Sequence, residues 1–248
     1  MRRRLIWAAQ WYLGCYADQY KQCWALKKMK LQYIGDSKDS FKWDYHDYLA
    51  QELRYPFLNI ALMMTPDDKS NDGKSYPSLF QARSEIIEFC EHLREKRSIE
   101  VVRRLPEKTG SNYTVEFHNG SAFITNQNRS QYFSGLSANT KQLLFLDPDN
   151  GFEPEKSYSE KHVLYSDIAS LLWQMSDDSV ISVFQHFRRK SFVEDFARIK
   201  QRLYSGYATA IYWHSLMFVA IGKSQKVIAQ VSEANKKYSR THPVKVIA

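Results

Sequence analysis

Apolar runs that alternate with amphipathic stretches in the second half of the chain constrain the fold more than any other feature. Two runs, residues 143–146 and 180–184, are apolar almost throughout, as strands that are buried on both faces of a sheet require. Residues 163–173 and 192–203 instead carry apolar side chains at helical spacing. Strands that alternate with helices predict an α/β fold, with a mainly parallel sheet and helices on both of its faces.

The end of the chain departs from this alternation. Residues 208–214 and 216–221 have the pattern of two strands with a tight connection between them, and a helical pattern follows over residues 227–238. Only antiparallel strands can be joined by so short a connection, because parallel neighbours need a long crossover. The sequence therefore predicts an antiparallel C-terminal hairpin at one side of the parallel sheet.

The first half of the chain gives more varied signals. We expect a helix over 40–53, a strand over 57–64, a helix that begins at Pro77, a strand over 99–102, a strand or strand pair over 113–123 and a short helix near Tyr132. Residues 1–30 carry aromatic side chains at helical spacing and predict an N-terminal helical extension. Residues 31–248 would then form a single α/β domain.

Composition excludes several classes of protein. With 44% hydrophobic, 15% aromatic and 25% charged residues, the chain is typical of globular proteins and not of disordered ones. Its three cysteines form no C-x-x-C pair, which argues against a disulfide framework and leads us to expect a cytoplasmic protein. No run reaches the roughly 20 apolar residues of a membrane span, so we expect no membrane contact. The formal charge of +8 makes nucleic acid a candidate partner.

Polar side chains follow several of the predicted strands. In open α/β sheets, ligands bind outside the carboxyl ends of the strands, so residues at these ends are the first candidates for chemistry. Taken one by one, such residues also serve as turn formers and helix caps. The candidates for catalysis are Asp147, Asp149, Asn150 and His186. The candidates for cofactor binding are Asp36, Asp39, Lys42, Asp67, Asp72 and Gly73.

A series of motifs in these regions resembles a widespread group of uncharacterised bacterial proteins. The motifs are Gly35-Asp-x-x-Asp39-x-x-Lys42, Thr65-Pro-Asp-Asp-x-x-Asn71-Asp-Gly73, Phe145-Leu-Asp-Pro-Asp-Asn-Gly151, Lys161-His-Val-Leu-Tyr165 and Phe184-Gln-His-Phe187. The resemblance covers about residues 31–215 and implies no particular reaction.

More distantly, the chain is similar to class I methyltransferases, in particular to the 23S rRNA adenine-N6 methyltransferases and the three-Cys-motif partner proteins. This resemblance implies a Rossmann-like fold, S-adenosylmethionine as cofactor and nucleic acid as substrate. In those families an Asp-Pro-Pro-Tyr-type motif holds the target amine. Asp147 would here accept a hydrogen bond from the amino group of the base, and Asn150 would orient the base. The chain lacks the second proline, the aromatic residue and the usual Gly-x-Gly loop after the first strand.

Two further functions stay open. Hard cations such as Mg²⁺ or Mn²⁺ prefer oxygen ligands, and a carboxylate cluster could bind one in a nuclease or phosphodiesterase. The metal ligands in this hypothesis are Asp67, Asp147 and Asp149. His186 would then act as a ligand or general base, and Arg188 or Lys42 would hold a phosphate. The other hypothesis is a non-catalytic module that binds nucleic acid or a partner enzyme.

Overall fold

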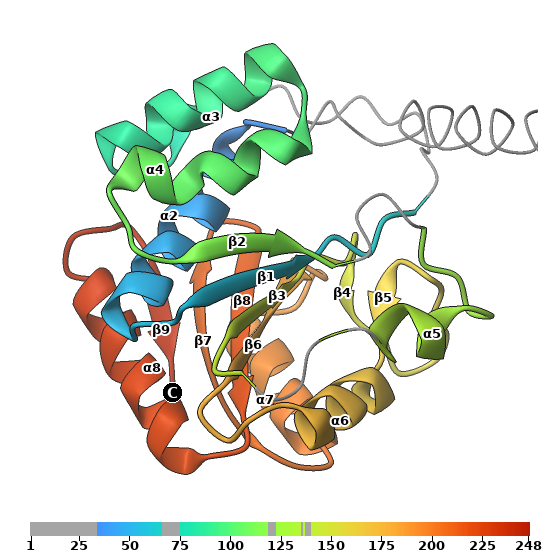
Figure 1. Cartoon of the computed structure of the whole chain (residues 1–248). Helices are drawn as coiled ribbons and strands as arrows, with labels where there is room; N and C mark the ends of the chain where they lie inside the picture. The colour runs from blue at the N-terminus through green and yellow to red at the C-terminus, as the bar shows by residue number, and fades with distance from the viewer. Residues whose placement is uncertain (1–33, 66–74, 119–122, 135, 137–139) are drawn as a thin grey trace, which may run out of the picture.

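The computed structural model describes residues 34–65, 75–118, 123–134, 136 and 140–248 (Figure 1). In this part of the chain one sheet of seven strands has the order β2-β1-β3-β6-β8-β7-β9. The strands are β1 (Phe57–Ala61), β2 (Thr114–Phe117), β3 (Leu143–Leu146), β6 (Val180–His186), β7 (Tyr207–Trp213), β8 (Leu216–Gly222) and β9 (Lys245–Ile247). Two short strands, β4 (Gly151–Phe152) and β5 (His162–Val163), pair separately in parallel.

The directions of the strands confirm the mainly parallel sheet and the C-terminal hairpin. β2, β1, β3 and β6 are parallel neighbours. β8 lies antiparallel between β6 and β7, so β7 runs in the same direction as the first four strands. β9, which the sequence did not predict, pairs antiparallel with β7 at the edge.

Helices cover both faces of the sheet, as the sequence predicted (Figure 1). The helices are α2 (Ser37–Glu52), α3 (Ser84–Lys96), α4 (Leu105–Thr109), α5 (Arg129–Ser134), α6 (Tyr165–Gln174), α7 (Phe192–Arg202) and α8 (Gln225–Tyr238). In β3, Leu143 and Phe145 join the core under α2, α3 and α8, whereas Leu144 and Leu146 join the core under α6 and α7. Successive side chains of a strand point to opposite faces, so a strand between two helical layers must be apolar throughout.

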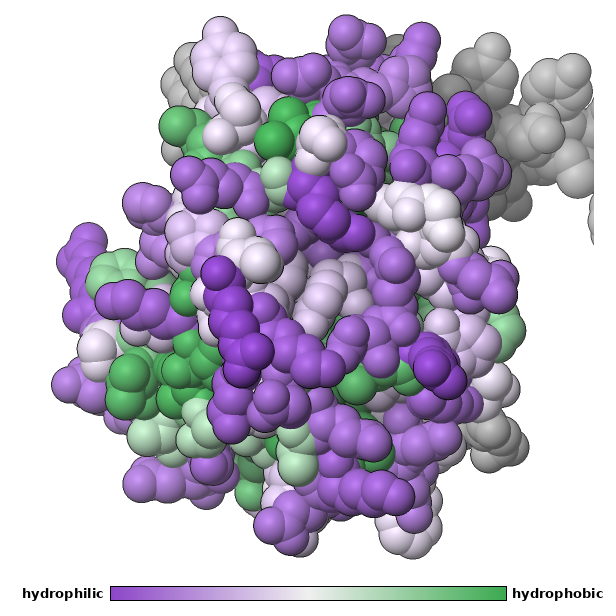
Figure 2. All heavy atoms as spheres, turned by 90° about the vertical axis from the view of Figure 1, so that its left-hand side faces the viewer, coloured by the Kyte–Doolittle hydropathy of each residue, from purple (hydrophilic) through white to green (hydrophobic). Residues whose placement is uncertain are grey.

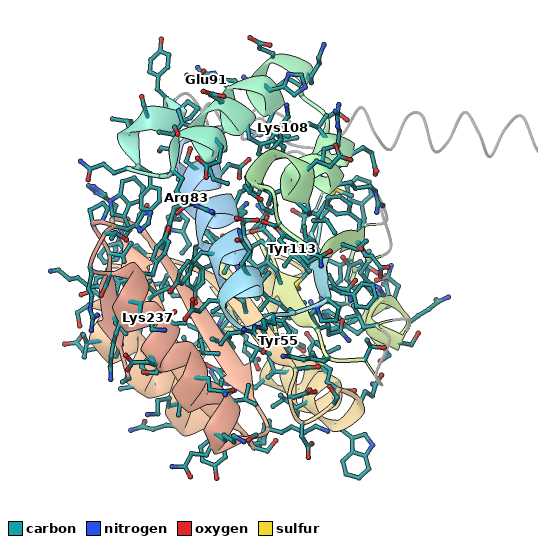
Figure 3. The ribbon with its side chains drawn as sticks, turned by 60° about the vertical axis from the view of Figure 1, so that its left-hand side comes forward. Tyr55, Arg83, Glu91, Lys108, Tyr113 and Lys237 are labelled. Atoms are coloured by element: carbon teal, nitrogen blue, oxygen red, sulfur yellow. The ribbon has the colours of Figure 1, made fainter. Side chains whose placement is uncertain are left out.

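The helix α2 is buried although it carries many polar residues. Asp44 and Asp47 are both fully buried, and Arg83 donates hydrogen bonds to each of them. Tyr113 also donates to Asp47, at 2.7 Å. Figure 3 shows Arg83 and Tyr113 beside α2, and Figure 2 shows polar side chains over most of the outer surface on this side. A helix of this kind is tolerated inside a protein because its buried polar groups are hydrogen-bonded.

One predicted element of the first half was wrong, and another begins later than predicted. Residues 99–102 form no strand but belong to a 3-10 helix, Ile99–Arg104, in which only Val102 is fully buried. Short apolar runs do not distinguish a strand from a helix, and the edge position beside β1 is taken by β2. The helix expected from Pro77 is present as α3 but begins only at Ser84, and Pro77–Leu79 form a single 3-10 turn. Extended backbone at Phe80 separates the two and turns its ring into the core, 4.8 Å from that of Phe41.

The other predicted elements are confirmed within a few residues, with the short helix near Tyr132 present as α5. Of the strand or strand pair expected over 113–123, one strand is present as β2, and residues 119–122 lie outside the described residues. The predicted N-terminal extension, residues 1–30, lies outside the described residues. Among the helices that are described, none combines the length and apolarity that a membrane crossing demands.

Candidate functional site

The boundary between β1 and β3 is a topological switch point. From β1 the chain passes to β2 on one side of β1 and then to β3 on its other side. Ligands of open α/β sheets bind in the crevice at the carboxyl ends of strands related in this way. Asp147 follows β3 here, and its backbone N–H donates to the carbonyl of Ala61 at the end of β1, at 2.9 Å. We call Asp36, Asp39, Lys42, Thr65, Asp147 and Asp149 the switch-point site.

Lys42 is the central cation of the switch-point site. Its Nζ lies 2.8 Å from Asp147 Oδ2 and 3.1 Å from Asp39 Oδ1. The exposed fractions of the three side chains are 13% for Lys42, 17% for Asp147 and 8% for Asp39. Burial opposes the charged form of Lys42, but Asp147 and Asp39 outweigh it and raise the pKa of Lys42 above its ordinary value. Burial raises the pKa of Asp147, and the ammonium group of Lys42 opposes this rise.

The Gly35 to Lys42 motif brings these charges together through the start of α2. Asp36 caps the helix, since its Oδ1 accepts from the N–H groups of Lys38 and Asp39 at 2.9 and 3.1 Å. Asp39 Oδ2 accepts from Gly35 N at 2.8 Å, which leaves Oδ1 for Lys42. Gly35 has a φ of +79°, and a Cβ at this position would lie 2.2 Å from the Cys90 carbonyl oxygen. Glycine is therefore required at the first position of the motif.

Asp36 is the residue of this motif whose charge is most disfavoured. Burial, followed by the nearby charge of Asp39, raises the pKa of Asp36 to about 6. The Asp36 side chain thus caps α2, but its surroundings disfavour the ionised form that a free carboxyl group adopts at neutral pH.

Replacement of Asp36 by Asn is expected to raise the free energy of unfolding at pH 8 by about 1 kcal/mol, since Asn caps helices as well as Asp and carries no charge. A folded-state pKa raised from 3.8 to about 6 stabilises the protein below pH 3.8, and this contribution is lost as the pH rises through 6. Urea unfolding should therefore show the advantage of the variant shrinking from pH 8 to pH 4. A difference that is constant over this range would contradict the assignment. Asp36→Ala, which loses the cap, should be destabilised.

Asp149 joins the loop after β3 to the segment after β1. Thr65 Oγ1 donates to Asp149 Oδ2 at 2.5 Å. The ends of both strands at the switch point are thus linked by a side-chain hydrogen bond in addition to the backbone bond of Asp147. Asp149 therefore lies where the sequence placed it, at the edge of the crevice.

Asn150 and His186 are less closely tied to this cluster. Asn150 is exposed, and its backbone N–H donates to the carbonyl of Lys161 at 3.0 Å. His186 is the last residue of β6, and its Nδ1 donates to the carbonyl of Phe187 at 3.2 Å. Within the described ranges, no hydrogen bond or ion pair joins His186 to Asp147. The structure therefore brings Lys42 to Asp147 but does not pair His186 with it.

A buried histidine that the sequence analysis did not single out lies on the same helix as Lys42. His46 Nδ1 donates to the carbonyl of Lys42 at 2.7 Å, so Nε2 of the neutral ring accepts from Ser182 Oγ, at 2.8 Å. Burial lowers the pKa of His46 to about 3, which keeps the imidazole neutral. The pair fixes α2 against β6. The sequence signal for this contact was Ser182, which places a hydroxyl group inside the otherwise apolar run of residues 180–184.

Three of the predicted cofactor-binding residues, Asp67, Asp72 and Gly73, lie outside the described residues. Asp67 was also a proposed metal ligand. Among the residues that the structure does describe, no group of three or more His, Cys, Asp or Glu side chains is arranged to hold a metal ion.

Comparison with known proteins adds no relative. No protein-family model matches the chain, and no curated protein matches it.

Proposed function

We propose that the protein is a class I methyltransferase that uses S-adenosylmethionine and acts on nucleic acid. The observation that carries the proposal is the position of the Lys42–Asp147 pair at the switch point of a sheet in which β8 lies antiparallel between β6 and β7. The classic doubly wound sheet has the order 3-2-1-4-5-6. An antiparallel strand inserted before the last parallel strand is the feature in which the chain is similar to class I methyltransferases. A cytoplasmic location, expected from the unpaired cysteines, is part of the proposal.

The charges of the switch-point site suit the methionine end of S-adenosylmethionine, which carries one carboxylate and one ammonium group. Lys42 is an ammonium group that would hold the carboxylate, and Asp39 is a carboxylate that would hold the ammonium. Asp36 would lie beside them as an acceptor for hydroxyl groups. Asp67, Asp72 and Gly73, which follow β1 in the sequence, complete the proposed cofactor site. The bound cofactor would supply an activated methyl group.

Asp147 is the residue that we expect to bind the target amine, which accepts the methyl group. Its Oδ2 is bound by Lys42, so Oδ1 is the oxygen proposed to accept a hydrogen bond from the target amine. Lys42 favours the ionised carboxylate against the effect of burial and fixes its orientation, and His46 binds the backbone carbonyl of Lys42. Asn150, exposed three residues further along the loop, would orient the base.

Calorimetric titration of the purified protein with S-adenosylmethionine, and separately with Mn²⁺, tests the proposal. We expect S-adenosylmethionine to bind with a stoichiometry of about one, as for a single site per chain. Lys42→Met should weaken this binding, whereas Lys38→Met, on the same helix but outside the ion pairs, should not. Binding of Mn²⁺ alone, lost in Asp147→Ala, would overturn the proposal in favour of a metal-dependent hydrolase.

A further inference from the structure

Three arginines and a tyrosine form a second polar cluster at the same edge of the sheet. Arg188 follows β6, Arg198 and Arg202 lie on α7, and Tyr165 begins α6. The guanidinium carbon of Arg202 lies 4.4 Å from the centre of the Tyr165 ring. We call these four residues the arginine cluster. Tyr165 belongs to one of the motifs that the proposed function leaves unexplained.

The arginine cluster contains buried donors that lack acceptors. Arg188 Nη1, Arg198 Nε and Tyr165 OH are buried, and within the described part of the chain none of them has a hydrogen-bond partner. The Tyr165 side chain is almost completely buried, with 2% of the residue exposed. One acceptor nearby, Asp195 Oδ2, is also buried without a partner there. Because buried polar groups are nearly always hydrogen-bonded, three donors against one acceptor indicate that a ligand supplies further acceptors.

Arg188 also lacks an ion-pair partner among the described residues. Arg198 pairs with Asp195 at 2.5 Å and with Glu155 at 3.8 Å, and Glu153 lies 3.9 Å from Arg202. Arg188 forms no ion pair with any described residue, and its Nη2 donates to the neutral amide oxygen of Gln185 at 3.1 Å. Burial lowers the pKa of Arg188, and the charges of Arg198 and Arg202 add to this against the attraction of Asp195. A bound anion would supply Arg188 with the ion-pair partner that it lacks among the described residues.

We infer that the arginine cluster binds a phosphate group. A guanidinium donates two parallel hydrogen bonds to a phosphate, which has acceptor oxygens for donors from several directions. The donors come from three separate segments, the loop after β6, α7 and the start of α6. The side chain of Arg202 is 34% exposed and forms the rim of the cluster.

The position of the cluster links it to the switch-point site. Gln185 is fully buried, and its Oε1 accepts from both Arg188 Nη2 and the backbone N–H of Phe152, at 3.1 and 2.9 Å. Phe152 belongs to β4, which directly follows the segment that carries Asp147 and Asn150. A phosphate at the arginine cluster would thus lie at the same edge of the sheet as the proposed catalytic loop. Its assignment to a nucleic-acid backbone rests on the proposed function, whereas phosphate binding itself does not.

The test measures binding of inorganic phosphate, and of a fluorescent single-stranded oligonucleotide, to the wild-type protein, Arg188→Gln and Lys190→Gln. Lys190 is an exposed neighbour in the same loop, so both variants lose one positive charge. We expect Arg188→Gln to weaken phosphate binding at least about tenfold, and Lys190→Gln less than about threefold, at constant ionic strength. Arg202→Gln, at the rim, should weaken binding as well and replaces Arg188→Gln if that variant does not fold.

Each outcome decides between the alternatives. Parallel losses for phosphate and oligonucleotide would support a backbone phosphate as the ligand. A loss for phosphate alone would support the site but identify a free phosphate compound as its ligand. No phosphate binding by the wild-type protein, or equal losses in Arg188→Gln and Lys190→Gln, would overturn the inference. Failure to bind S-adenosylmethionine while phosphate binds would overturn the proposed methyltransferase alone.

Discussion

Replacement of Asp47 by Ala is expected to lower the free energy of unfolding by about 3 to 5 kcal/mol, the usual cost of removing one partner from a buried ion pair. Asp47 lies on α2 and is fully buried. Its Oδ2 binds Arg83 Nη2 at 2.7 Å, and its two oxygens together accept from four further side chains. These are Gln51, Thr109, Ser111 and Tyr113. The Ala variant leaves buried donors from several elements without an acceptor.

Urea unfolding followed by circular dichroism measures this loss. Asp47→Asn, which keeps one acceptor oxygen but no charge, should lose about half as much. Asp177→Ala is the matched control, because Asp177 is 84% exposed and lies 3.5 Å from Lys223 in a surface pair. Such a pair contributes at most about 1 kcal/mol. A similar loss in Asp47→Ala and Asp177→Ala would show that the hydrogen bonds of Asp47 do not stabilise the fold.

Replacement of Asp147 by Asn is expected to reduce methyl transfer to nucleic acid at least about 100-fold, the effect of removing one group that stabilises a transition state. Asn keeps the size of Asp and one acceptor oxygen, so the fold should be retained. Asp147→Ala should abolish activity too, but it also removes one of the two carboxylates that bind Lys42 and should cost stability. Transfer of labelled methyl groups to RNA and DNA measures the rate.

Variants at two other predicted catalytic residues separate this proposal from metal-dependent hydrolysis. Asp149→Asn and His186→Ala should affect methyl transfer less than Asp147→Asn, since only Asp147 is held by Lys42. Activity lost in all three variants together with affinity for Mn²⁺ would favour the hydrolase. An unchanged rate in Asp147→Asn would place the reaction elsewhere in the molecule.

Much of the second half of the fold could be predicted because its strands are buried on both faces. Residues 143–146 and 180–184 lie between two helical layers, which requires apolar side chains on both faces of each strand. The run at 99–102 also has three apolar residues, but only Val102 is fully buried, so its 3-10 helical conformation was not evident. The turn at Pro77 was misread for a different reason, since the burial of Phe80 decides where the helix begins.

The candidate site could be predicted only as a set of residues at strand ends. Asp147 and Asp149 were found because they follow an apolar strand, and Asp39 and Lys42 because they belong to one of the motifs that resemble a bacterial family. Their partners were not evident, because 105 positions separate Lys42 from Asp147. His46 and the arginine cluster were missed, since each depends on contacts between elements that are distant in the sequence.

The sequence by itself determined the alternation of strands and helices, the antiparallel hairpin and the polar strand ends, because these follow from local patterns of burial and backbone geometry. Only the tertiary structure decided that Lys42 neutralises Asp147, that α2 is a buried polar helix and that Arg188 has no carboxylate partner among the described residues. Ion pairs and buried hydrogen bonds depend on which side chains meet across the sheet. That choice is made by strand order and helix packing, which no local pattern specifies.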